Sequence, residues 1–355
     1  MHLVSEPSVA KILRGLTQEQ CHDFINAFSE ALATVTAESN IPQAQRLIHQ
    51  PLRNSLVTRD QNLSLFMPVS NTANTGIKIV TAPTTGGIVG VINVFSADGR
   101  IMGILSAAEL TAFRTALATM TLFVRCSSVR KEHVLIFGSG RQAEWHARLA
   151  LLLVPEQIKK ITFVNRGRGK LAALEKGLLA ELGSLRPDIA LNTLAQEGTP
   201  DYEARLRSEL GASDVIFSCT PSTQPNFPFS YLSESGPPKT RFISLIGSYK
   251  PHMREIDTET LLSGGGKIYV DSKEACLEES GELIAAGVRE EQLVEIGGLF
   301  DGKGDAELVE GPNRGNVVFK CVGMGIMDLV VAKKMLDVAQ QQGDGVHIDG
   351  FQGMD

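Results

Sequence analysis

The feature that most constrains the fold of this chain is a strand–turn–helix pattern in residues 133–150. Residues 134–137 are all apolar and two are β-branched, which indicates a strand buried on both faces. Gly138 and Gly140 then allow a tight turn, and helical spacing resumes at Arg141. In such a unit, backbone N–H groups and a helix N-terminus face a pyrophosphate. The sequence therefore predicts a dinucleotide site at this turn, with Ala143 as the third small residue of the fingerprint.

The segments after this turn alternate between apolar runs and helical patterns. Strands are predicted at residues 160–165, 214–220, 241–247 and 267–270, and helices at about residues 168–183, 200–211 and 273–286. This alternation is typical of a parallel sheet with crossover helices. We therefore expect a Rossmann-type doubly wound α/β domain over residues 123–312.

The residues before the turn follow a different pattern. Residues 1–50 are predicted to be helical, with a capping box from Thr17 to Gln20. Short strands are predicted at 62–67, 76–80, 88–96 and 100–106, and Asp98-Gly99 joins the last two as a hairpin. A helix is expected from Ala107. Residues 1–122 are thus predicted to form an α+β substrate and dimerisation domain with a mainly antiparallel sheet.

The C-terminal region, residues 313–355, does not resemble another nucleotide-domain strand. A helix is predicted over residues 322–340, and we expect it to return to the first domain. The last dozen residues are rich in glycine and acidic side chains, so they are predicted to form a loose tail.

Composition excludes several classes of partner. A net charge of −6 provides no broad basic surface for nucleic acid. No apolar run approaches the roughly 20 residues that a membrane span needs, and the N-terminus lacks the pattern of a signal peptide. The five cysteines are scattered, without a C-x-x-C pair, so neither a metal site nor a disulfide framework is predicted. We expect a cytoplasmic protein.

The end of the second predicted nucleotide-domain strand indicates which cofactor is used. An NAD site usually has Asp or Glu there, for the ribose 2′-hydroxyl. Here the strand ends at Asn165, and Arg166, Arg168 and Lys170 follow without a carboxylate. A guanidinium can pair with a 2′-phosphate through its planar fork, so NADP(H) is favoured over NAD(H). The alternative interpretation is a solvated basic loop.

Three cations in the first domain could hold an anionic substrate. Arg53 follows Pro51, Lys78 lies within an apolar strand, and Arg114 lies within an apolar helix. Lys78 either points outward to water or faces an anion, and the strand pattern leaves both open. Convergence of the three on one pocket would suit a carboxylate-bearing substrate, but sequence spacing does not establish it.

Several motifs follow one another in a fixed order over nearly the whole length of the chain. The most specific pair is L-T-x-x-R-T-A, at residues 110–116, followed by G-x-G-x-Q-A, at residues 138–143. The other segments are residues 67–68, 76–78, 219–222, 246–248, 254–257, 270–272 and 318–325, with Asp328. In these motifs the chain resembles the ornithine cyclodeaminase/mu-crystallin family.

The resemblance implies roles for individual residues. Arg53, Lys78 and Arg114 would grip the substrate carboxylate, with Lys78 and Arg114 as the catalytic pair, and Met67 and Tyr249 would line the substrate pocket. The implied cofactor residues are Thr84, Thr85, Thr115, Gly138, Ser139, Gly140, Arg141, Gln142, Asn165, Arg166, Arg168, Thr220, Pro221 and Ile246. Family members are typically homodimers, joined through the antiparallel sheets of their substrate domains.

The residues at two positions distinguish the ornithine cyclodeaminases of this family from its ketimine reductases. Ornithine cyclodeaminases have a glutamate two residues before Met-Pro and an aspartate two residues after the glycine that ends the fifth strand. Here these positions are Leu65 and Tyr249. Leucine cannot hold a distal ammonium or move protons during cyclisation. The sequence therefore resembles the mu-crystallin branch of ketimine reductases.

The predicted function is NADPH-dependent reduction of a cyclic ketimine or imino acid, such as piperideine- or pyrroline-2-carboxylate, by hydride transfer to the C=N carbon. Alternatives within enzymes are an NAD-dependent ornithine cyclodeaminase and an alanine-dehydrogenase-like oxidoreductase. A protein that binds small acids and nucleotide without turnover is a further alternative, which the retention of Lys78 and Arg114 disfavours.

Overall fold

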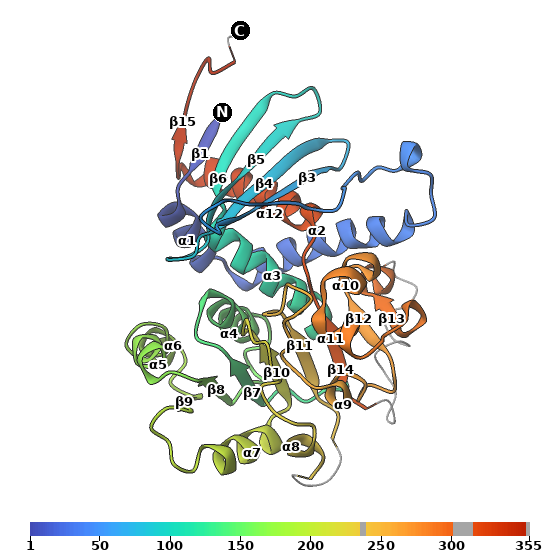
Figure 1. The fold of residues 1–355 in the computed structure, drawn as a ribbon. Coiled ribbons are helices and arrows are strands. Elements are labelled where there is room, and N and C mark those ends of the chain that lie inside the picture. Colours follow the sequence, from blue (N-terminus) through green and yellow to red (C-terminus); the bar gives the residue numbers. More distant parts are fainter. Residues whose placement is uncertain (235–238, 301–314, 353–355) are drawn as a thin grey trace. The chain divides into compact units, whose positions relative to one another are not determined.

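The computed structural model describes residues 1–234, 239–300 and 315–352. They form two compact units (Figure 1): Met1–Thr115 with Gly323–Asp355 is the first, and Ala116–Val322 is the second. The division falls within helix α3 (Ala107–Phe123), whereas the sequence placed it after residue 122. The second predicted boundary, after residue 312, lies outside the described residues.

The first unit is built on a seven-stranded sheet with the order β15-β1-β6-β5-β4-β3-β2. Its strands are β1 (His2–Val4), β2 (Asn54–Val57), β3 (Leu63–Ser70), β4 (Asn74–Ala82), β5 (Val89–Ser96), β6 (Ile101–Ser106) and β15 (Val346–His347). Neighbouring strands run antiparallel except β1 and β6. The prediction of a mainly antiparallel sheet is confirmed, including the β5–β6 hairpin, where Gly99 has a φ of 84°.

Four helices belong wholly or partly to this unit: α1 (Glu6–Arg14), α2 (Gln18–Ala37), the start of α3, and α12 (Gly325–Gln342). Helix α12 contacts β3, β4, β5 and α2. Two glycines permit its close approach to the sheet. A Cβ on Gly76 would lie 2.9 Å from Leu329, and one on Gly103 would lie 2.5 Å from Leu336. The C-terminal helix is therefore part of the core of the first unit.

The two ends of the chain differ from the sequence-based expectation. Residues 1–50 are not helical throughout, because β1 precedes α1 and only a 3-10 turn (Gln43–Gln45) follows α2. The capping box of Thr17 and Gln20 at the start of α2 is confirmed. The expectation of a loose tail is wrong for residues 346–347, because β15 pairs with β1 and the amino group of Met1 donates to the Ile348 carbonyl oxygen. Backbone pairing, which composition does not report, orders this segment.

The second unit is built on an eight-stranded sheet with the order β13-β12-β14-β11-β10-β7-β8-β9. Its strands are β7 (His133–Phe137), β8 (Lys160–Asn165), β9 (Ala190–Ala195), β10 (Val215–Ser218), β11 (Phe242–Leu245), β12 (Ile268–Val270), β13 (Leu293–Glu295) and β14 (Val317–Lys320). All neighbouring pairs are parallel. This confirms the Rossmann-type doubly wound sheet. The strand order reverses between β7 and β10, which is where such sheets bind ligands.

The helices of this unit follow the predicted order but are more interrupted. They are α4 (Arg141–Leu153), α5 (Arg168–Leu174), α6 (Ala180–Leu185), α7 (Tyr202–Ala212), α8 (Ser230–Ser233), α9 (Thr258–Leu261), α10 (Lys273–Glu279) and α11 (Gly281–Ala285), with 3-10 turns at Glu290–Gln292 and Ile296–Leu299. A π-helical turn, Glu175–Leu179, separates α5 from α6. The predicted helix 273–286 is divided at Ser280.

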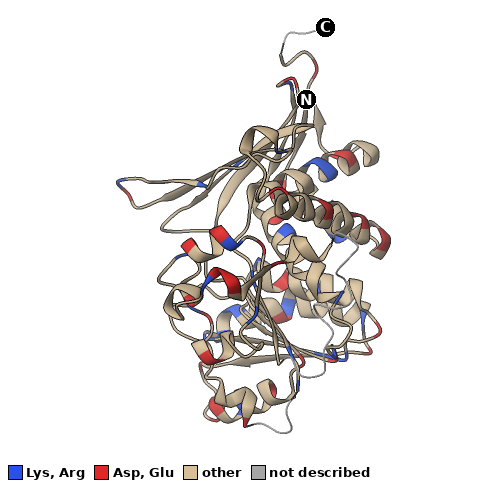
Figure 2. Ribbon diagram, turned by 90° about the vertical axis from the view of Figure 1, so that its right-hand side faces the viewer, with Lys and Arg blue, Asp and Glu red and all other residues tan. Residues whose placement is uncertain are grey.

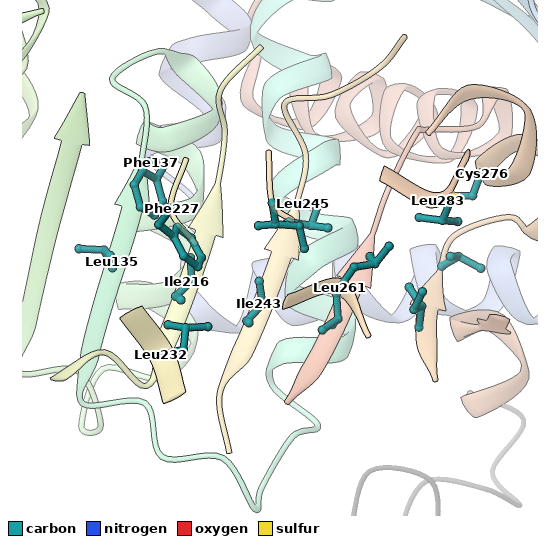
Figure 3. Close-up of a cluster of buried hydrophobic side chains, with 14 of the residues drawn as sticks. Leu135, Phe137, Ile216, Phe227, Leu232, Ile243, Leu245, Leu261, Cys276 and Leu283 are labelled. Atoms are coloured by element: carbon teal, nitrogen blue, oxygen red, sulfur yellow. The ribbon is translucent and has the colours of Figure 1, made fainter. Parts of the chain in front are cut away.

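Buried apolar side chains hold the second unit together. One cluster extends across the sheet from Leu135 and Phe137 on β7 to Ile216 on β10 and Ile243 on β11 (Figure 3). Because each strand contributes apolar residues in succession, the strands read as continuous hydrophobic runs, as expected of a sheet covered on both faces.

Charged residues are interspersed along the elements of each unit (Figure 2). The net charge of the whole sequence is −6. Within the described ranges, no helix is both long enough and apolar enough to cross a bilayer.

Candidate active site

Two cations and one carboxylate form a buried cluster in the first unit. Strand β4 alternates its side chains, and Gly76, Lys78 and Val80 lie on the buried face. The Lys78 side chain is 2% exposed and its Nζ lies 2.6 Å from Oδ2 of Asp328, on helix α12. Arg114, on α3, donates from Nε to Oδ1 of Asp328 at 2.9 Å. We call Lys78, Arg114 and Asp328 the cation cluster.

The electrostatics of the cation cluster favour an additional anion. Burial lowers the pKa of Lys78 from 10.5 to about 8, and repulsion by Arg114 and Arg53 acts in the same direction. Asp328 opposes this shift but is shared by two cations. A buried charge needs a partner of opposite charge, and here the single carboxylate of Asp328 is shared by the two buried cations. A ligand carboxylate would supply the missing negative charge.

The turn after β7 has the features of a phosphate site. Gly138 has a φ of 114°, and a Cβ there would lie 2.9 Å from the Cys219 carbonyl oxygen, so this position requires glycine. Gly140 is the N-cap of α4, and a Cβ on it would meet no atom within 4 Å. The loop after β7 and the loop after β10 are thus in contact at the switch point of the sheet, with open space at the helix N-terminus.

Two side chains in this turn have no partner within the described part of the chain. The hydroxyl of Ser139 and Oε1 of Gln142 are both buried without a hydrogen bond. Buried polar atoms are nearly always paired in folded proteins. A hydroxyl can donate to a phosphate oxygen, and an amide oxygen can accept from a ribose hydroxyl. These two atoms therefore fit a bound dinucleotide.

A cavity of about 970 Å³ adjoins this turn. Its lining includes Asn165 and Arg166 at the end of β8, Lys170 in the first turn of α5, and Thr220 and Pro221 in the loop after β10. Such a volume is at the upper end of the range for small-molecule and cofactor sites. The cavity and the glycine turn together form a site large enough for the adenosine half of a dinucleotide.

Comparisons with known proteins agree with this geometry. No family model matches the chain. It is 32% identical over 306 residues to an uncharacterized protein of Saccharomyces cerevisiae, YGL159W, covering 79% of this chain and 82% of that one. It is 28% identical to a Delta(1)-pyrroline-2-carboxylate reductase of Bacillus cereus, covering 86% and 90%. It is 26% identical to the ketimine reductase mu-crystallin of Mus musculus, covering 68% and 66%.

Solved structures show the same fold. The Delta(1)-pyrroline-2-carboxylate reductase of Thermococcus litoralis, in complex with NADH and L-proline, matches with a TM-score of 0.79 and 21% identity, over 98% of this chain and 100% of that one. The iminosuccinate reductase of Paracoccus denitrificans, in complex with NAD+, matches with a TM-score of 0.72 and 22% identity, over 98% and 99%.

The chain belongs to the ornithine cyclodeaminase/mu-crystallin family. The family consists of NAD(P)H-dependent oxidoreductases that act on imines and imino acids, and the chain is an enzyme of this class. The resemblance inferred from the sequence motifs is confirmed.

The structure brings the other predicted substrate residues of the first unit close to Lys78. Met67 is buried and lies directly opposite Lys78 in the β3–β4 register. Leu65, at the position of the deaminase glutamate, lies opposite Val80, on the same face of the sheet. Arg53 is half-buried and close enough to lower the pKa of Lys78. The β3 side chains next to Lys78 on this face, Leu65 and Met67, are therefore apolar, whereas its charged neighbours come from other elements.

The threonines predicted to contact the cofactor have mixed surroundings. Thr84 and Thr85 are exposed in the loop between β4 and β5. The Thr115 side chain is buried, and its hydroxyl donates to the Thr111 carbonyl oxygen at 2.8 Å within helix α3. The hydroxyl of Thr115 is thus engaged by its own helix.

The cations after β8 are not equivalent. Arg166 Nη2 donates to Ser222 Oγ at 3.0 Å and lines the cavity. The guanidinium of Arg168 instead pairs with Glu175, at 2.9 Å from Nη1 to Oε1, and this residue is not among those that line the cavity. Arg141 is exposed in the first turn of α4. Of these two predicted arginines, Arg166 lines the cavity and Arg168, at the start of α5, does not.

Ile246 and Tyr249 follow β11 in the second unit. Ile246 is buried, and its backbone N–H donates to the Ser218 carbonyl oxygen at 2.9 Å. Tyr249 is half-buried, and Lys250 Nζ lies 5.5 Å from the centre of its ring. Neither residue provides the carboxylate that a deaminase has at the Tyr249 position.

Asp328 is the residue to which sequence reasoning assigned no role. The sequence does contain a sign of its importance, because Asp328 is the one carboxylate among the apolar residues that begin α12, Gly325–Leu329. A buried charge within an apolar helix face requires a partner. That signal predicts a buried counterion, but it does not identify Lys78 and Arg114 as the partners.

Proposed function

We propose that the chain reduces an α-imino acid, a cyclic ketimine of the piperideine- or pyrroline-2-carboxylate type, with hydride from NADPH. The observation that carries the proposal is the cation cluster, in which one carboxylate serves two buried cations next to the apolar side chains of Leu65 and Met67. A site of this kind suits a ligand with a carboxylate and an uncharged ring.

The chain's own residues would bind and orient the imine. Arg114 and Lys78 would hold its carboxylate, since a guanidinium and an ammonium can each donate to it. The bound cofactor supplies a hydride for the C=N carbon. An imine that is already protonated makes little demand for acid catalysis, and fixed orientation lowers the barrier. An imine that binds unprotonated would need one proton at its ring nitrogen, and Lys78, with its lowered pKa, could donate it.

The test of this function is a direct assay of the purified protein. We expect NADPH oxidation with piperideine-2-carboxylate or pyrroline-2-carboxylate, followed by absorbance, and the cyclic amino acid as product. Ammonia and proline formed from ornithine and NAD, without reduction of either imine, would contradict the proposal and favour the cyclodeaminase alternative. Reversible formation of pyruvate from alanine would favour the alanine-dehydrogenase alternative.

The preference for NADPH over NADH is part of the proposal and is supported by Arg166. We expect Arg166→Ala to weaken NADPH binding by roughly 10- to 100-fold, because a charge-assisted hydrogen bond contributes about 1.5–3 kcal/mol. NADH has no 2′-phosphate, so its affinity should change little. Titration of both cofactors by protein fluorescence measures this difference.

Arg168→Ala is the comparison variant for this measurement. Its guanidinium pairs with Glu175 at the surface, so we expect a much smaller effect on either cofactor. Equal losses of NADPH and NADH affinity in Arg166→Ala would contradict the assignment of Arg166 to the 2′-phosphate.

A homodimer joined through the sheet of the first unit also belongs to the proposal. Four apolar side chains on β2 and β5 are well exposed: Leu56, Val57, Val89 and Val91 have exposed fractions of 60%, 60%, 62% and 38%. Strand β2 is an edge of the sheet, where an apolar strand can pair with another chain, and β5 lies inside the sheet, where its exposed valines leave an apolar face that a partner could cover. Sedimentation equilibrium at micromolar concentration should give twice the chain mass, and a monomer would contradict the proposal.

We place the protein in the cytoplasm, in agreement with its cysteines. Within the described residues none of the five forms a disulfide, and four of them are buried. Reduced thiols are the usual state in a reducing compartment. Fractionation of cells that produce an epitope-tagged chain tests this location, and recovery of the chain outside the cytoplasmic fraction would contradict it.

A further inference from the structure

A buried carboxylate lies beneath the loops that follow β10 and β11 in the second unit. Glu255 is 0% exposed. Its Oε1 accepts from Ser218 Oγ at 2.7 Å and from the Thr220 N–H at 2.8 Å. Its Oε2 accepts from the N–H groups of Gly247 at 2.7 Å and Ser248 at 3.2 Å. Each oxygen therefore holds the loop of a different strand.

The two loops are in direct backbone contact at this point. A Cβ on Gly247 would lie 2.1 Å from the carbonyl oxygen of Thr220, so only glycine fits there. Thr220 and Pro221 line the cavity next to the glycine turn, and Ile246 immediately precedes Gly247. The carboxyl ends of neighbouring parallel strands are where ligands bind in such sheets. Glu255 thus fixes the loop after β10, which lines the cavity, against the loop after β11.

A second layer of charged groups holds Glu255 itself. Its N–H donates to Glu282 Oε1 at 2.8 Å, and the Ser248 hydroxyl also donates to Glu282. Lys320 Nζ donates to the Ser248 carbonyl oxygen at 2.6 Å and lies 3.8 Å from Glu282 Oε2. Burial raises the pKa of Glu255 to about 7, although Lys320 and the surrounding donors favour its charged form.

This arrangement contributes more to geometry than to net stability. Two buried carboxylates share one ammonium, and the desolvation of such groups offsets most of their attraction. Hydrogen bonds with fixed directions, in contrast, define one loop conformation. This network lies at the carboxyl ends of β10 and β11, where parallel sheets bind their ligands, so the fixed loop conformation can serve cofactor binding.

We infer that Glu255 is a positioning residue of the dinucleotide site, whose carboxylate fixes the loops after β10 and β11 in the conformation that binds the cofactor. The inference rests on the proposed function only in that a nicotinamide dinucleotide binds at this cavity. It does not depend on the identity of the imine.

The variant Glu255→Gln tests the inference. An amide has a single acceptor oxygen, so one of the two loops would face an NH₂ group in place of an acceptor. We expect the Kd of NADPH to rise roughly 10- to 100-fold, the range for loss of a hydrogen bond to a charged group. Isothermal titration measures the Kd, and thermal unfolding records the accompanying loss of stability.

Asp214→Asn is the matched control. Asp214 is also a buried carboxylate that joins two strands, since its Oδ2 accepts from the His133 N–H at 3.0 Å and its Oδ1 from Lys239 Nζ at 2.8 Å. Asp214 immediately precedes β10 and so lies at the amino end of that strand, whereas the loops that Glu255 holds follow the carboxyl ends of β10 and β11. A purely structural role for Glu255 predicts equal effects of the two variants. We expect both to lower the melting temperature and only Glu255→Gln to raise the Kd.

The outcomes separate this inference from the proposed function. If the wild-type protein binds neither NADPH nor NADH, the proposed function is wrong. If the wild-type protein binds cofactor and Glu255→Gln binds it equally well, or Asp214→Asn weakens binding as much, the positioning role is wrong. Should Glu255→Gln fail to fold, Ser218→Ala removes one donor to Oε1 and leaves the backbone contacts. We expect a several-fold rise in Kd for that variant, and an unchanged Kd would overturn the inference.

Discussion

The Lys78→Met variant should lose almost all imine reduction while it still binds NADPH. Methionine has a similar length but no charge, so the cation cluster would change from two cations and one carboxylate to a neutral pair of Arg114 and Asp328. Truncating one partner of a buried charge pair costs about 2–5 kcal/mol. That corresponds to a loss of roughly 30- to 4,000-fold in kcat/KM. Steady-state assays with the imine, together with a cofactor titration, measure the two effects separately.

The control for this variant is Lys131→Met, which removes another buried ammonium. Lys131 is 2% exposed and lies in the second unit, where its Nζ donates to the carbonyl oxygens of Cys126 and Val129. We expect Lys131→Met to lower the melting temperature and to retain turnover. Turnover that survives in Lys78→Met would show that the role assigned to Lys78 is wrong.

The lowered pKa of Lys78 adds a pH dependence to this prediction. Because this pKa is about 8, the ammonium loses its proton as pH rises through 8. The affinity for pyrrole-2-carboxylate, a planar carboxylate without a C=N bond, should be constant at neutral pH and fall up to about tenfold per pH unit above 8. Lys78→Met should abolish this dependence. The free energy of unfolding changes in the opposite direction. The destabilisation caused by the buried charge is complete below pH 8 and disappears as pH rises from 8 to 10.5.

The Asp328→Asn variant should lose much more stability than removal of the partly exposed carboxylate of Asp337 on the same helix. It would leave Lys78 and Arg114 buried side by side without their shared carboxylate. Breaking a buried ion pair in this way costs about 3–5 kcal/mol of unfolding free energy. Chemical denaturation with a common m-value measures the loss. We also expect pyrrole-2-carboxylate to raise the melting temperature more in the variant than in the wild type, because the ligand replaces the missing charge.

Asp337→Asn provides the control on the same helix. Asp337 pairs with Lys333 one turn away at 2.7 Å, with both side chains partly exposed. Such a pair contributes only about 0.3–0.5 kcal/mol. If Asp328→Asn costs no more than Asp337→Asn, the charge balance described for the cation cluster is incorrect.

Local sequence signals predicted the elements that nearby residues determine. Strand β8 has the predicted bounds, Lys160–Asn165, and the hairpin at Asp98-Gly99 and the capping box at Thr17 formed as expected. In each case the information lies within a few residues, as a positive φ, a side chain that caps a helix, or an unbroken apolar run.

Other elements depend on pairing between distant segments, and these were missed. Strands β1 and β15 lie at opposite ends of the chain and pair with each other. Strand β9 alternates exposed and half-buried residues over its first four positions, so it lacks a continuous apolar run. Strand β14 has only four residues, and its neighbours in the sheet, β12 and β11, come from other parts of the chain. Short segments of this kind are strands because strands from distant parts of the chain pair with them, so tertiary context overrides local preference.

The sequence by itself determined the dinucleotide turn at Gly138–Gly140, the parallel sheet around it and the family, since these depend on contiguous motifs. Only the tertiary structure decided the environment of Lys78, for which the strand pattern allowed both water and an anion. The charge that settles this question belongs to Asp328, 250 positions later. The same holds for Glu255, whose partners come from loops after two different strands. Backbone preferences are encoded in neighbouring residues, whereas the pairing of buried charges depends on distances that exist only in the folded chain.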